Sequence, residues 1–203
     1  RMAEYIQRFL GVPFDYARHL QKSYYRQFGT TLAGMMKVHN MDPTGFLAYV
    51  HEIDLSPVPE SPELRAAIAR LPGRRLIFTA GSHRHAERVA GKLGILDLFE
   101  DIVDIVDSGF LPKEKAESYD RLIASHGVTP RECAMFEDMP HNLEPAHLLG
   151  MTTVLVHSTG HDHPVQQRIK SWTSVPEHIH HMTEDLTGFL AGIDLDGTGE
   201  RAT

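Results

Sequence analysis

The chain has 203 residues, 41% of them hydrophobic and 23% charged, as is ordinary for a soluble globular protein of one domain with a small subdomain. Its formal net charge of −7 argues against broad nucleic-acid binding, and no apolar run approaches the ~20 residues of a membrane span. A single cysteine, Cys133, excludes an internal disulfide, and the first residues lack the pattern of a signal peptide. We therefore expect a cytoplasmic protein that binds neither membranes nor nucleic-acid polymers.

The first 57 residues have the pattern of successive helices. Apolar residues recur at helical spacing over 2–10, and the stretch 13–28 lies between a proline and a glycine, which favour helix starts and ends respectively. Shorter amphipathic stretches cover 31–39 and 43–53. The proline-rich sequence SPVPESP then marks a boundary. We predict a helical subdomain at 1–57, an α/β core at 58–190 and a tail at 191–203.

Beyond the boundary, short apolar stretches alternate with helical patterns. This rhythm predicts a parallel sheet with helices on both faces, and a ligand site beyond the carboxyl ends of the strands. The expected helices cover 61–71, 84–94, 114–127 and 142–150. The expected strands cover 74–79, 100–106, 133–138 and 152–157.

Two of these strand ends carry residues suited to binding an anion. Thr79 is followed by Ala80 and Gly81, so a hydroxyl and a glycine turn enter a helix and offer donors to a phosphate. In the alternative interpretation, Ser82 is an ordinary helix cap. Lys113 follows the next strand and can neutralise phosphoryl oxygens, although it also fits a solvated charge cluster at a helix start.

The third strand end carries two adjacent carboxylates, Glu137 and Asp138. Such a pair is costly without a cation between its members, and Mg²⁺ is a hard ion that prefers oxygen ligands. Alternatively, Asp138 caps the helix that begins near His141 or Asn142. Threonine, lysine and acid thus follow successive parallel strands, and we expect them to meet at one edge of the sheet.

Three segments together resemble the haloacid dehalogenase (HAD) superfamily of phosphatases, and most closely its pyrimidine 5′-nucleotidase branch. FTAGSHRHA resembles the branch's FTNGS, and FEDMPHNLEPAHLLGMTTV resembles its FED-x-x-x-NL segment. YYRQFGTTLAGMM resembles its signature in the cap, the helical subdomain that covers the active site. The resemblance covers about residues 1–190. It implies a HAD-like Rossmannoid α/β fold, with residues 1–57 as a helical cap.

The resemblance also implies an activity. It points to a Mg²⁺-dependent phosphomonoesterase that hydrolyses pyrimidine nucleoside 5′-monophosphates, or another small phosphorylated metabolite, through an aspartyl phosphate. By position, Thr79 and Lys113 are implied as catalytic and phosphate-binding, with Ala80 and Gly81 in the same phosphate loop. Asp138 is implied as a direct Mg²⁺ ligand, and Glu137 as a second or water-mediated one.

Two departures from the branch alter the site. Ala80 stands where the branch has Asn, so one side-chain hydrogen bond near the phosphate is lost. In the lysine motif, Glu114 and Ala116 replace two prolines, which makes the loop less rigid.

The largest departure concerns the nucleophile motif Asp-x-Asp-x-Thr, which in this family ends a strand ahead of the cap. Here the sequence DLDGT, from Asp194 through Asp196 to Thr198, stands near the end of the chain. In one interpretation a permuted chain uses GFLAGI as this strand and Asp194 as the nucleophile. In the other, the motif lies upstream of Arg1 and the match is coincidental. The helix-like pattern of EDLTGFLAGI favours coincidence.

Two further alternatives stay open in the sequence. The chain can be a non-catalytic binder of phosphate or nucleotides that keeps Thr79, Lys113 and Asp138 without a nucleophile. The histidine-rich stretches HSTGHDHP and HIHH have spacing that can bind zinc, but their composition favours a polar loop followed by an exposed strand.

Overall fold

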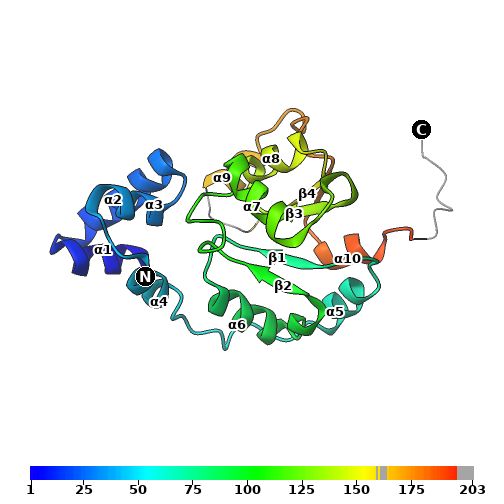
Figure 1. Cartoon of the computed structure of the whole chain (residues 1–203), viewed down its shortest axis with the longest axis horizontal. Helices are drawn as coiled ribbons and strands as arrows, with labels where there is room; N and C mark the ends of the chain where they lie inside the picture. Colours follow the sequence, from blue (N-terminus) through cyan, green and yellow to red (C-terminus); the bar gives the residue numbers. More distant parts are fainter. Residues whose placement is uncertain (159, 161–163, 196–203) are drawn as a thin grey trace.

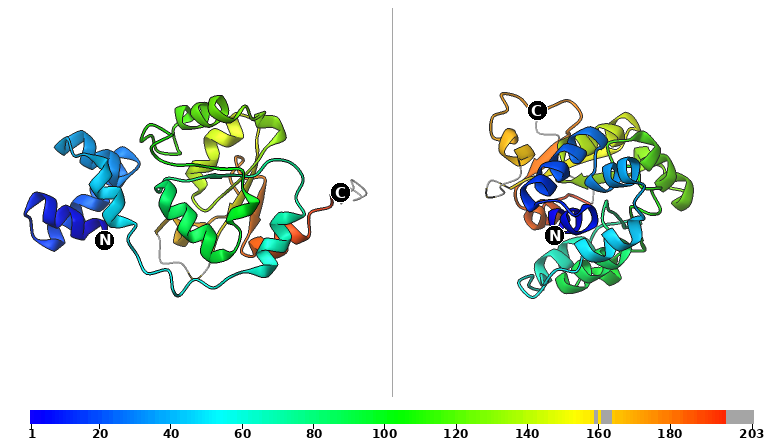
Figure 2. Two further views of the ribbon diagram at one scale, coloured as in Figure 1. Left: turned by 60° about the horizontal axis from the view of Figure 1, so that its bottom comes forward. Right: turned by 90° about the vertical axis from the view of Figure 1, so that its left-hand side faces the viewer.

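The computed structural model of the chain describes residues 1–158, 160 and 164–195. Helices α1 to α4 stand together at one end, beside a larger unit of parallel strands and helices (Figure 1). Figure 2 shows the same arrangement from two other directions, with α10 at the end of the larger unit away from α1 to α4. None of the described helices is both long and apolar enough to cross a membrane.

The N-terminal helices form a unit with a hydrophobic core of its own, called here the helical unit (residues 2–50). The side chains of Thr30 and Asp42 cap its third and fourth helices by accepting backbone N–H hydrogen bonds at 3.0 Å. Ile6, Met35 and Phe46 lie at the centre of the core and are at most 2% exposed. The helices are α1 (Met2–Leu10), α2 (Phe14–Phe28), α3 (Thr31–His39) and α4 (Pro43–Val50).

Strands and helices alternate in the larger unit, as the sequence predicts. Its strands are β1 (Leu76–Phe78), β2 (Asp101–Val103), β3 (Ala134–Glu137), β4 (Thr152–Val156) and β5 (His181–Thr183). Its helices are α5 (Pro62–Ala69), α6 (His83–Leu93), α7 (Ala116–His126), α8 (Leu143–Leu148), α9 (Pro164–Ile169) and α10 (Leu186–Ala191). Short 3₁₀ turns lie at Leu96–Leu98, Pro130–Glu132 and Pro140–Asn142. This mixture of helices and parallel strands confirms the predicted α/β class.

The described strands form two parallel sheets rather than one. β1 pairs with β2, and β3, β4 and β5 follow one another in the second sheet. Side chains from both sheets meet in the same two hydrophobic clusters. Leu76 and Met135 pack with α7 and α8, whereas Ile77 and Phe136 pack with α5, α6 and α10. The two sheets therefore belong to one layer with helices on both faces.

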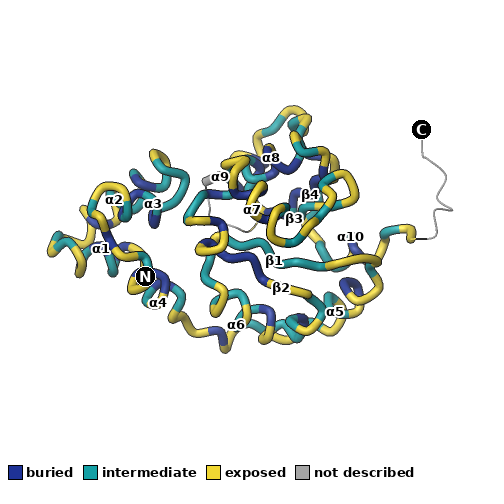
Figure 3. The backbone as a smooth tube through the Cα atoms, viewed as in Figure 1, coloured by how far each residue is buried: buried dark blue, intermediate teal, exposed yellow. Residues whose placement is uncertain are grey.

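The strands on the facing sides of the two sheets, β1 and β3, are less buried than the strands with which they pair, β2 and β4. Ile77 of β1 is partly exposed, whereas Ile102, its partner on the outer strand β2, is 5% exposed. Likewise Phe136 of β3 is partly exposed, whereas Val154 opposite it on β4 is 1% exposed (Figure 3). In parallel sheets the inner strands are normally buried on both faces. β1 and β3 instead resemble strands at the edge of a sheet, which pair with a neighbouring strand on one side only.

Local side-chain chemistry explains where the predicted elements change. The strand expected over 100–106 stops at Val103, because the Asp104 carboxylate accepts hydrogen bonds from the N–H groups of Val106 and Asp107 and turns the chain. GFLAGI lies in and just after helix α10, so its interpretation as a central strand is wrong. Helix α9 was not expected from the sequence.

Candidate functional site

Lys113 links the carboxyl ends of β1 and β3, the strands on the facing sides of the two sheets. It lies in the loop between β2 and α7, and its side chain is 13% exposed. The ammonium forms an ion pair with Glu137, at the end of β3, and donates to the Phe78 carbonyl of β1 at 3.4 Å. Thr79 N–H donates to the Val103 carbonyl of β2 at 2.9 Å. Because successive backbone groups of a strand point to opposite edges, the Phe78 carbonyl lies on the edge of β1 away from β2.

Glu137 is the more buried of the two adjacent carboxylates, with a side chain 4% exposed. One of its oxygens, Oε1, accepts the N–H groups of Asp138 and Met139 at 3.2 and 3.3 Å. Burial acts to raise the pKa of Glu137, but the Lys113 charge and side-chain hydrogen bonds with Asp138, Lys113 and Asn142 outweigh it and hold the pKa below its usual value. Glu137 is therefore a fixed negative charge.

Asp138 lies at the surface beside this charge. The residue as a whole is exposed, yet protein atoms surround its carboxyl group closely enough that burial is the main cause of its perturbed pKa. Hydrogen bonding to Glu137 and the negative charge of Glu137 add to burial, and the pKa of Asp138 rises to about 6. The Asp138 carbonyl accepts from the buried side chain of Gln166 at 2.5 Å, which holds the backbone in place.

The loop after β1 is shaped by internal hydrogen bonds. Thr79 Oγ1 accepts from Gly81 N–H at 2.9 Å, and a hydroxyl that accepts can still donate. Ser82, the expected cap of α6, does not cap it. Its hydroxyl instead lies 3.0 Å from His51 Nδ1. The first amide of α6, that of His83, donates to Asp104 Oδ2 at 2.8 Å. A carboxylate from the neighbouring strand end therefore holds the start of α6.

The structure brings the predicted site residues to one edge of the layer. Lys113 contacts the residue before Thr79 and the residue before Asp138, so all three strand ends converge on it. Ala80 is exposed and Gly81 partly exposed in the adjoining loop.

The helical unit approaches the same edge through the end of α2. Burial raises the pKa of Tyr25, and the charges of Glu114, Asp138 and Glu137 raise it further, which places the Tyr25 hydroxyl near the acidic residues. At Gly29, which has φ of 79°, a Cβ atom would lie 2.6 Å from Glu114 Oε1 and 2.7 Å from Pro112 Cγ. The loop that carries Lys113 thus packs directly against the helical unit.

Glu137 and Asp138 are the residues present that fit a divalent cation. The described residues contain no group of three or more His, Cys, Asp or Glu side chains that can hold a metal. Mg²⁺ does not need such a group, because it usually keeps several waters and takes one or two carboxylates together with substrate phosphate oxygens. A close carboxylate pair, one member of which has a raised pKa, is the donor chemistry that a hard cation stabilises.

Two histidines of the histidine-rich stretches have polar partners, whereas the buried Nε2 of His178 has no hydrogen-bond partner within the part of the chain that the structure describes. His180 Nδ1 accepts from Thr153 N–H at 3.0 Å, and His157 Nδ1 lies 3.4 Å from Glu184 Oε1. His161 and His163 lie outside the described residues.

Asp194 follows α10, which packs on α5 ahead of β1 and lies at the far end of the larger unit from the helical unit (Figure 1). Asp196, Gly197 and Thr198, the rest of the DLDGT motif, lie outside the described residues.

Two residues that frame the site, Asp104 and His51, were not singled out by function in the sequence. Asp104 looked like part of a strand, although an aspartate directly after an apolar strand is a turn signal that could have revealed it. His51 directly follows α4, and no local pattern indicates its position. Tyr25, by contrast, lies within the stretch YYRQFGTTLAGMM that resembles the cap signature. His51 and Tyr25 border the site because the helical unit packs against the strand ends.

Comparisons with known proteins agree with this architecture. A HAD phosphatase from Thermococcus onnurineus superposes with a TM-score of 0.56 at 18% identity, covering 89% of this chain and 81% of that one. The L-2-haloacid dehalogenase from Xanthobacter autotrophicus gives a TM-score of 0.55 at 15% identity, covering 93% and 90%. The UTR4 protein from Saccharomyces cerevisiae gives 0.50 at 18% identity, covering 89% and 77%.

These three structures share the fold with this chain. The sequence pattern of one hydrolase family, described as haloacid dehalogenase-like hydrolase, matches residues 4–150, which is most of the chain. The chain therefore belongs to the haloacid dehalogenase-like hydrolase family.

Proposed function

We propose that this protein is a Mg²⁺-dependent phosphomonoesterase that acts in the cytoplasm on a small phosphorylated metabolite, with pyrimidine nucleoside 5′-monophosphates as the substrate class. The observation that carries the proposal is the position of Lys113. Its partly buried ammonium stands between the Thr79 loop and the carboxylates of Glu137 and Asp138. A fixed cation between a hydroxyl-bearing loop and an acidic pair suits a phosphoryl group that bridges the two.

Each residue would contribute a separate interaction. The Thr79 hydroxyl and the backbone of Ala80 and Gly81 would hold phosphoryl oxygens, and Lys113 would neutralise the charge that grows on them. Glu137 and Asp138 would hold Mg²⁺. When bound, the ion would supply positive charge for the phosphoryl oxygens.

The nucleophile would come from a strand between β1 and β3. Among the described residues, neither strand pairs with another strand at its inner edge, where the Phe78 carbonyl accepts from Lys113. Both strands carry partly exposed apolar side chains, and they share the same two helix-covered faces. One parallel strand placed there would pair with both edges and join the two sheets. Its carboxyl end would lie next to Lys113. An aspartate there would attack phosphorus and form an aspartyl phosphate, and a second acid two residues on would protonate the leaving oxygen.

Residues 1–57 would act as the cap of this active site. The end of α2 already packs on the loop that carries Lys113, and the Tyr25 hydroxyl lies near the acidic pair. A cap in this position excludes water and contacts the leaving group. The choice of a pyrimidine nucleotide rests on the resemblance of Tyr24–Leu32 to the cap signature of that branch.

Two other functions remain as competing outcomes. A non-catalytic binder would use Thr79, Lys113 and Asp138 to hold phosphate or nucleotide without turnover. A phosphatase for another small ester, such as phosphoglycolate or a sugar phosphate, would use the same site with a different cap contact.

The direct experiment is phosphate release from a panel of phosphate esters by the 203-residue chain, measured alone and with the strand peptide of the second experiment, which supplies the nucleophile. With the peptide, uridine and cytidine 5′-monophosphate with Mg²⁺ should be the best substrates, and chelation of the metal should abolish turnover. Asp194→Asn should leave turnover unchanged, because Asp194 lies beyond α10. Saturable binding of nucleotide without any release in the presence of the peptide would instead favour the binder, and a preferred sugar phosphate would replace the substrate class.

A second experiment supplies the strand to the same chain as a synthetic peptide. A run of alternating valine and isoleucine followed by Asp-Leu-Asp-Gly-Thr should raise turnover if β1 and β3 accept a strand between them. Replacing both aspartates by asparagine should preserve binding but remove turnover. Prolines at alternate strand positions should remove both, because proline cannot donate to the ladder.

A further inference from the structure

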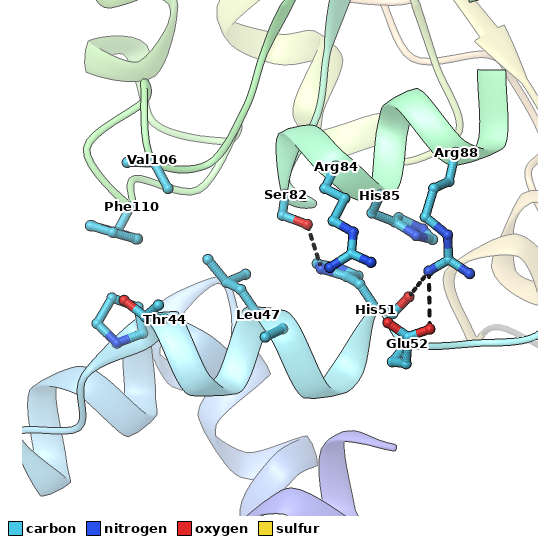
Figure 4. A pocket seen from close by; sticks show the side chains of 12 residues that line it. Thr44, Leu47, His51, Glu52, Ser82, Arg84, His85, Arg88, Val106 and Phe110 are labelled. Carbon is cyan, nitrogen blue, oxygen red and sulfur yellow. Dashed lines mark hydrogen bonds and ion pairs between the residues drawn. The ribbon is translucent and has the colours of Figure 1, made fainter. Parts of the chain in front are cut away.

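A cavity of about 310 Å³ lies between α4 of the helical unit and the start of α6 (Figure 4). Its volume is at the lower end of the ~300–1,000 Å³ typical of small-molecule sites, so it suits a single ring system. The cavity borders the phosphate loop. A Cβ atom on Gly81 would lie 3.3 Å from Thr79 Oγ1 and 3.5 Å from His51 Nε2, a residue that lines the cavity.

One wall of the cavity is apolar. It is formed by Leu47 and Ala48 of α4 together with Val106 and Phe110 from the loop after β2. Phe110 has φ of 61°, a conformation that is rare for a bulky residue, and its N–H donates to the Ile105 carbonyl at 2.7 Å. Such strain is retained where the surrounding structure fixes it, often at ligand sites. The Phe110 ring is thereby held at the cavity wall.

The opposite wall is polar but carries little unpaired charge. His51, which directly follows α4, stacks on His85 of α6 with ring centroids 4.5 Å apart and planes 12° apart. Burial is the main cause that lowers the pKa of both histidines. The Arg88 guanidinium donates to the His51 and Ile53 carbonyls at 3.0 and 2.9 Å.

Arg84 is the remaining cation of this wall. Within the part of the chain that the structure describes, it forms no hydrogen bond or ion pair, and it lies on the cavity side of α6 (Figure 4). Its planar guanidinium presents several donors in a fixed geometry. Across the cavity from Phe110, it can meet the polar edge of a ring whose face lies on the aromatic side chain.

We infer that this cavity holds the leaving group of the substrate, a flat and uncharged ring that bears carbonyl acceptors, and that Arg84 and Phe110 determine its selection. This inference rests on the proposed phosphatase function, because it assumes that the phosphoryl group lies at Thr79 and Gly81. Arg84 donates to the ring carbonyls, and Phe110 and Leu47 cover its face. Simple sugar phosphates fill the same phosphate site but leave the apolar wall uncovered.

Calorimetric binding to the full chain tests the inference with six probes: uridine 5′-monophosphate, uridine, ribose 5-phosphate, phosphoglycolate, inorganic phosphate and 5,6-dihydrouridine 5′-monophosphate, whose ring is not planar. The uridine nucleotide should bind tightest, and Arg84→Gln should weaken it by about tenfold while leaving ribose 5-phosphate unchanged. Arg131→Gln is the matched control, because Arg131 precedes β3 at the opposite end from Glu137. Phe110→Leu should reduce the preference for the planar ring over the dihydro ring.

The outcomes separate the two proposals. If no phosphate compound binds but uridine alone binds and depends on Arg84, the phosphatase proposal fails and the cavity assignment holds. If the uridine nucleotide binds no better than ribose 5-phosphate, the cavity assignment is wrong. It is equally wrong if Arg84→Gln changes the affinity for neither of these two compounds. It is also wrong if Arg84→Gln selectively weakens phosphoglycolate, because the arginine would then bind a carboxylate.

Discussion

Asp104 Oδ2 accepts a hydrogen bond from the backbone N–H of His83 at 2.8 Å, which ties the end of β2 to the first turn of α6. The other carboxylate oxygen of Asp104 accepts from the N–H groups of Val106 and Asp107 at 2.8 and 3.0 Å. Asp104 is 6% exposed. One buried side chain therefore fixes both the Thr79 loop before α6 and the loop that leads to Lys113.

Removing this side chain should destabilise the whole protein. Asp104→Ala would leave three backbone N–H groups without their acceptor, and each buried unpaired donor costs ~1–3 kcal/mol. We expect the free energy of unfolding in urea to fall by about 3 kcal/mol or more, given partial rescue by water. Asp104→Asn keeps one acceptor oxygen and should lose clearly less. A loss below about 0.5 kcal/mol for the alanine variant would mean that the two loops do not depend on the Asp104 carboxylate for their stability.

The Lys113–Glu137 pair should be costly to break from one side. Lys113→Met would leave a buried carboxylate without its cation, which typically costs ~3–5 kcal/mol, and the pKa of Glu137 should rise because burial would be less opposed. Urea unfolding and a carboxyl titration by NMR measure the two effects. The double variant Lys113→Met/Glu137→Leu should recover most of the stability but no phosphate binding. If the double variant still binds phosphate, Lys113 is not part of the phosphate-binding site.

Gly29→Ala should disturb the contact between the helical unit and the Lys113 loop. The new Cβ would clash with Glu114 and Pro112, in addition to the backbone strain of a positive φ. Gly11→Ala is the matched control, because Gly11 has φ of 66° and a Cβ added there would meet no atom within 4 Å. Gly11→Ala should lose ~1–2 kcal/mol through the strain of its left-handed conformation. Gly29→Ala should lose more, because its φ of 79° and ψ of −31° lie outside that conformation and overpacking adds a further ~1–3 kcal/mol. Equal losses in urea unfolding would show that this contact is unimportant.

The contribution of His51 and His85 to stability should fall as the pH is lowered through the range in which histidine titrates. Their folded-state pKa values lie below the ordinary 6.5, so at these two residues the unfolded chain binds more protons between the two values. This contribution to the free energy of unfolding should decrease as the pH falls below about 6.5, and level off below the lowered pKa values. Asp138, whose pKa rises to about 6, acts in the opposite direction over part of this range, so the comparison of parent and variant isolates the histidines. Arg84 and Arg88 line the same cavity and disfavour added positive charge, whereas Glu52 partly offsets it.

Urea unfolding between pH 5 and pH 7.5 measures this dependence. The double variant His51→Gln/His85→Gln should show a smaller decrease than the parent chain. His19→Gln is the control, since His19 lies on α2 outside this cavity. An identical pH profile for parent and double variant would assign the dependence to other groups.

The positions of most helices and strands could be predicted from the sequence because their signals are local. Periodic apolar residues over 2–10, the Asp42-Pro43 helix start and the apolar stretch before Thr79 each act within a few neighbouring residues. The order of strands and helices then gave the α/β class and the shared edge, since parallel strands end on the same side of a sheet. The exceptions were positions where a side chain competes for the backbone, as Asp104 does after Val103.

The sequence by itself determined which chemical groups follow each strand: the Thr79 hydroxyl, the Lys113 ammonium and the Glu137–Asp138 pair. Only the tertiary structure decided that Lys113 pairs with Glu137 and reaches Phe78, that His51 stacks on His85, and that the described strands form two sheets rather than one. These relationships join residues far apart along the chain. They depend on how the helical unit packs and on which strands pair, and neither is set by local conformational preference.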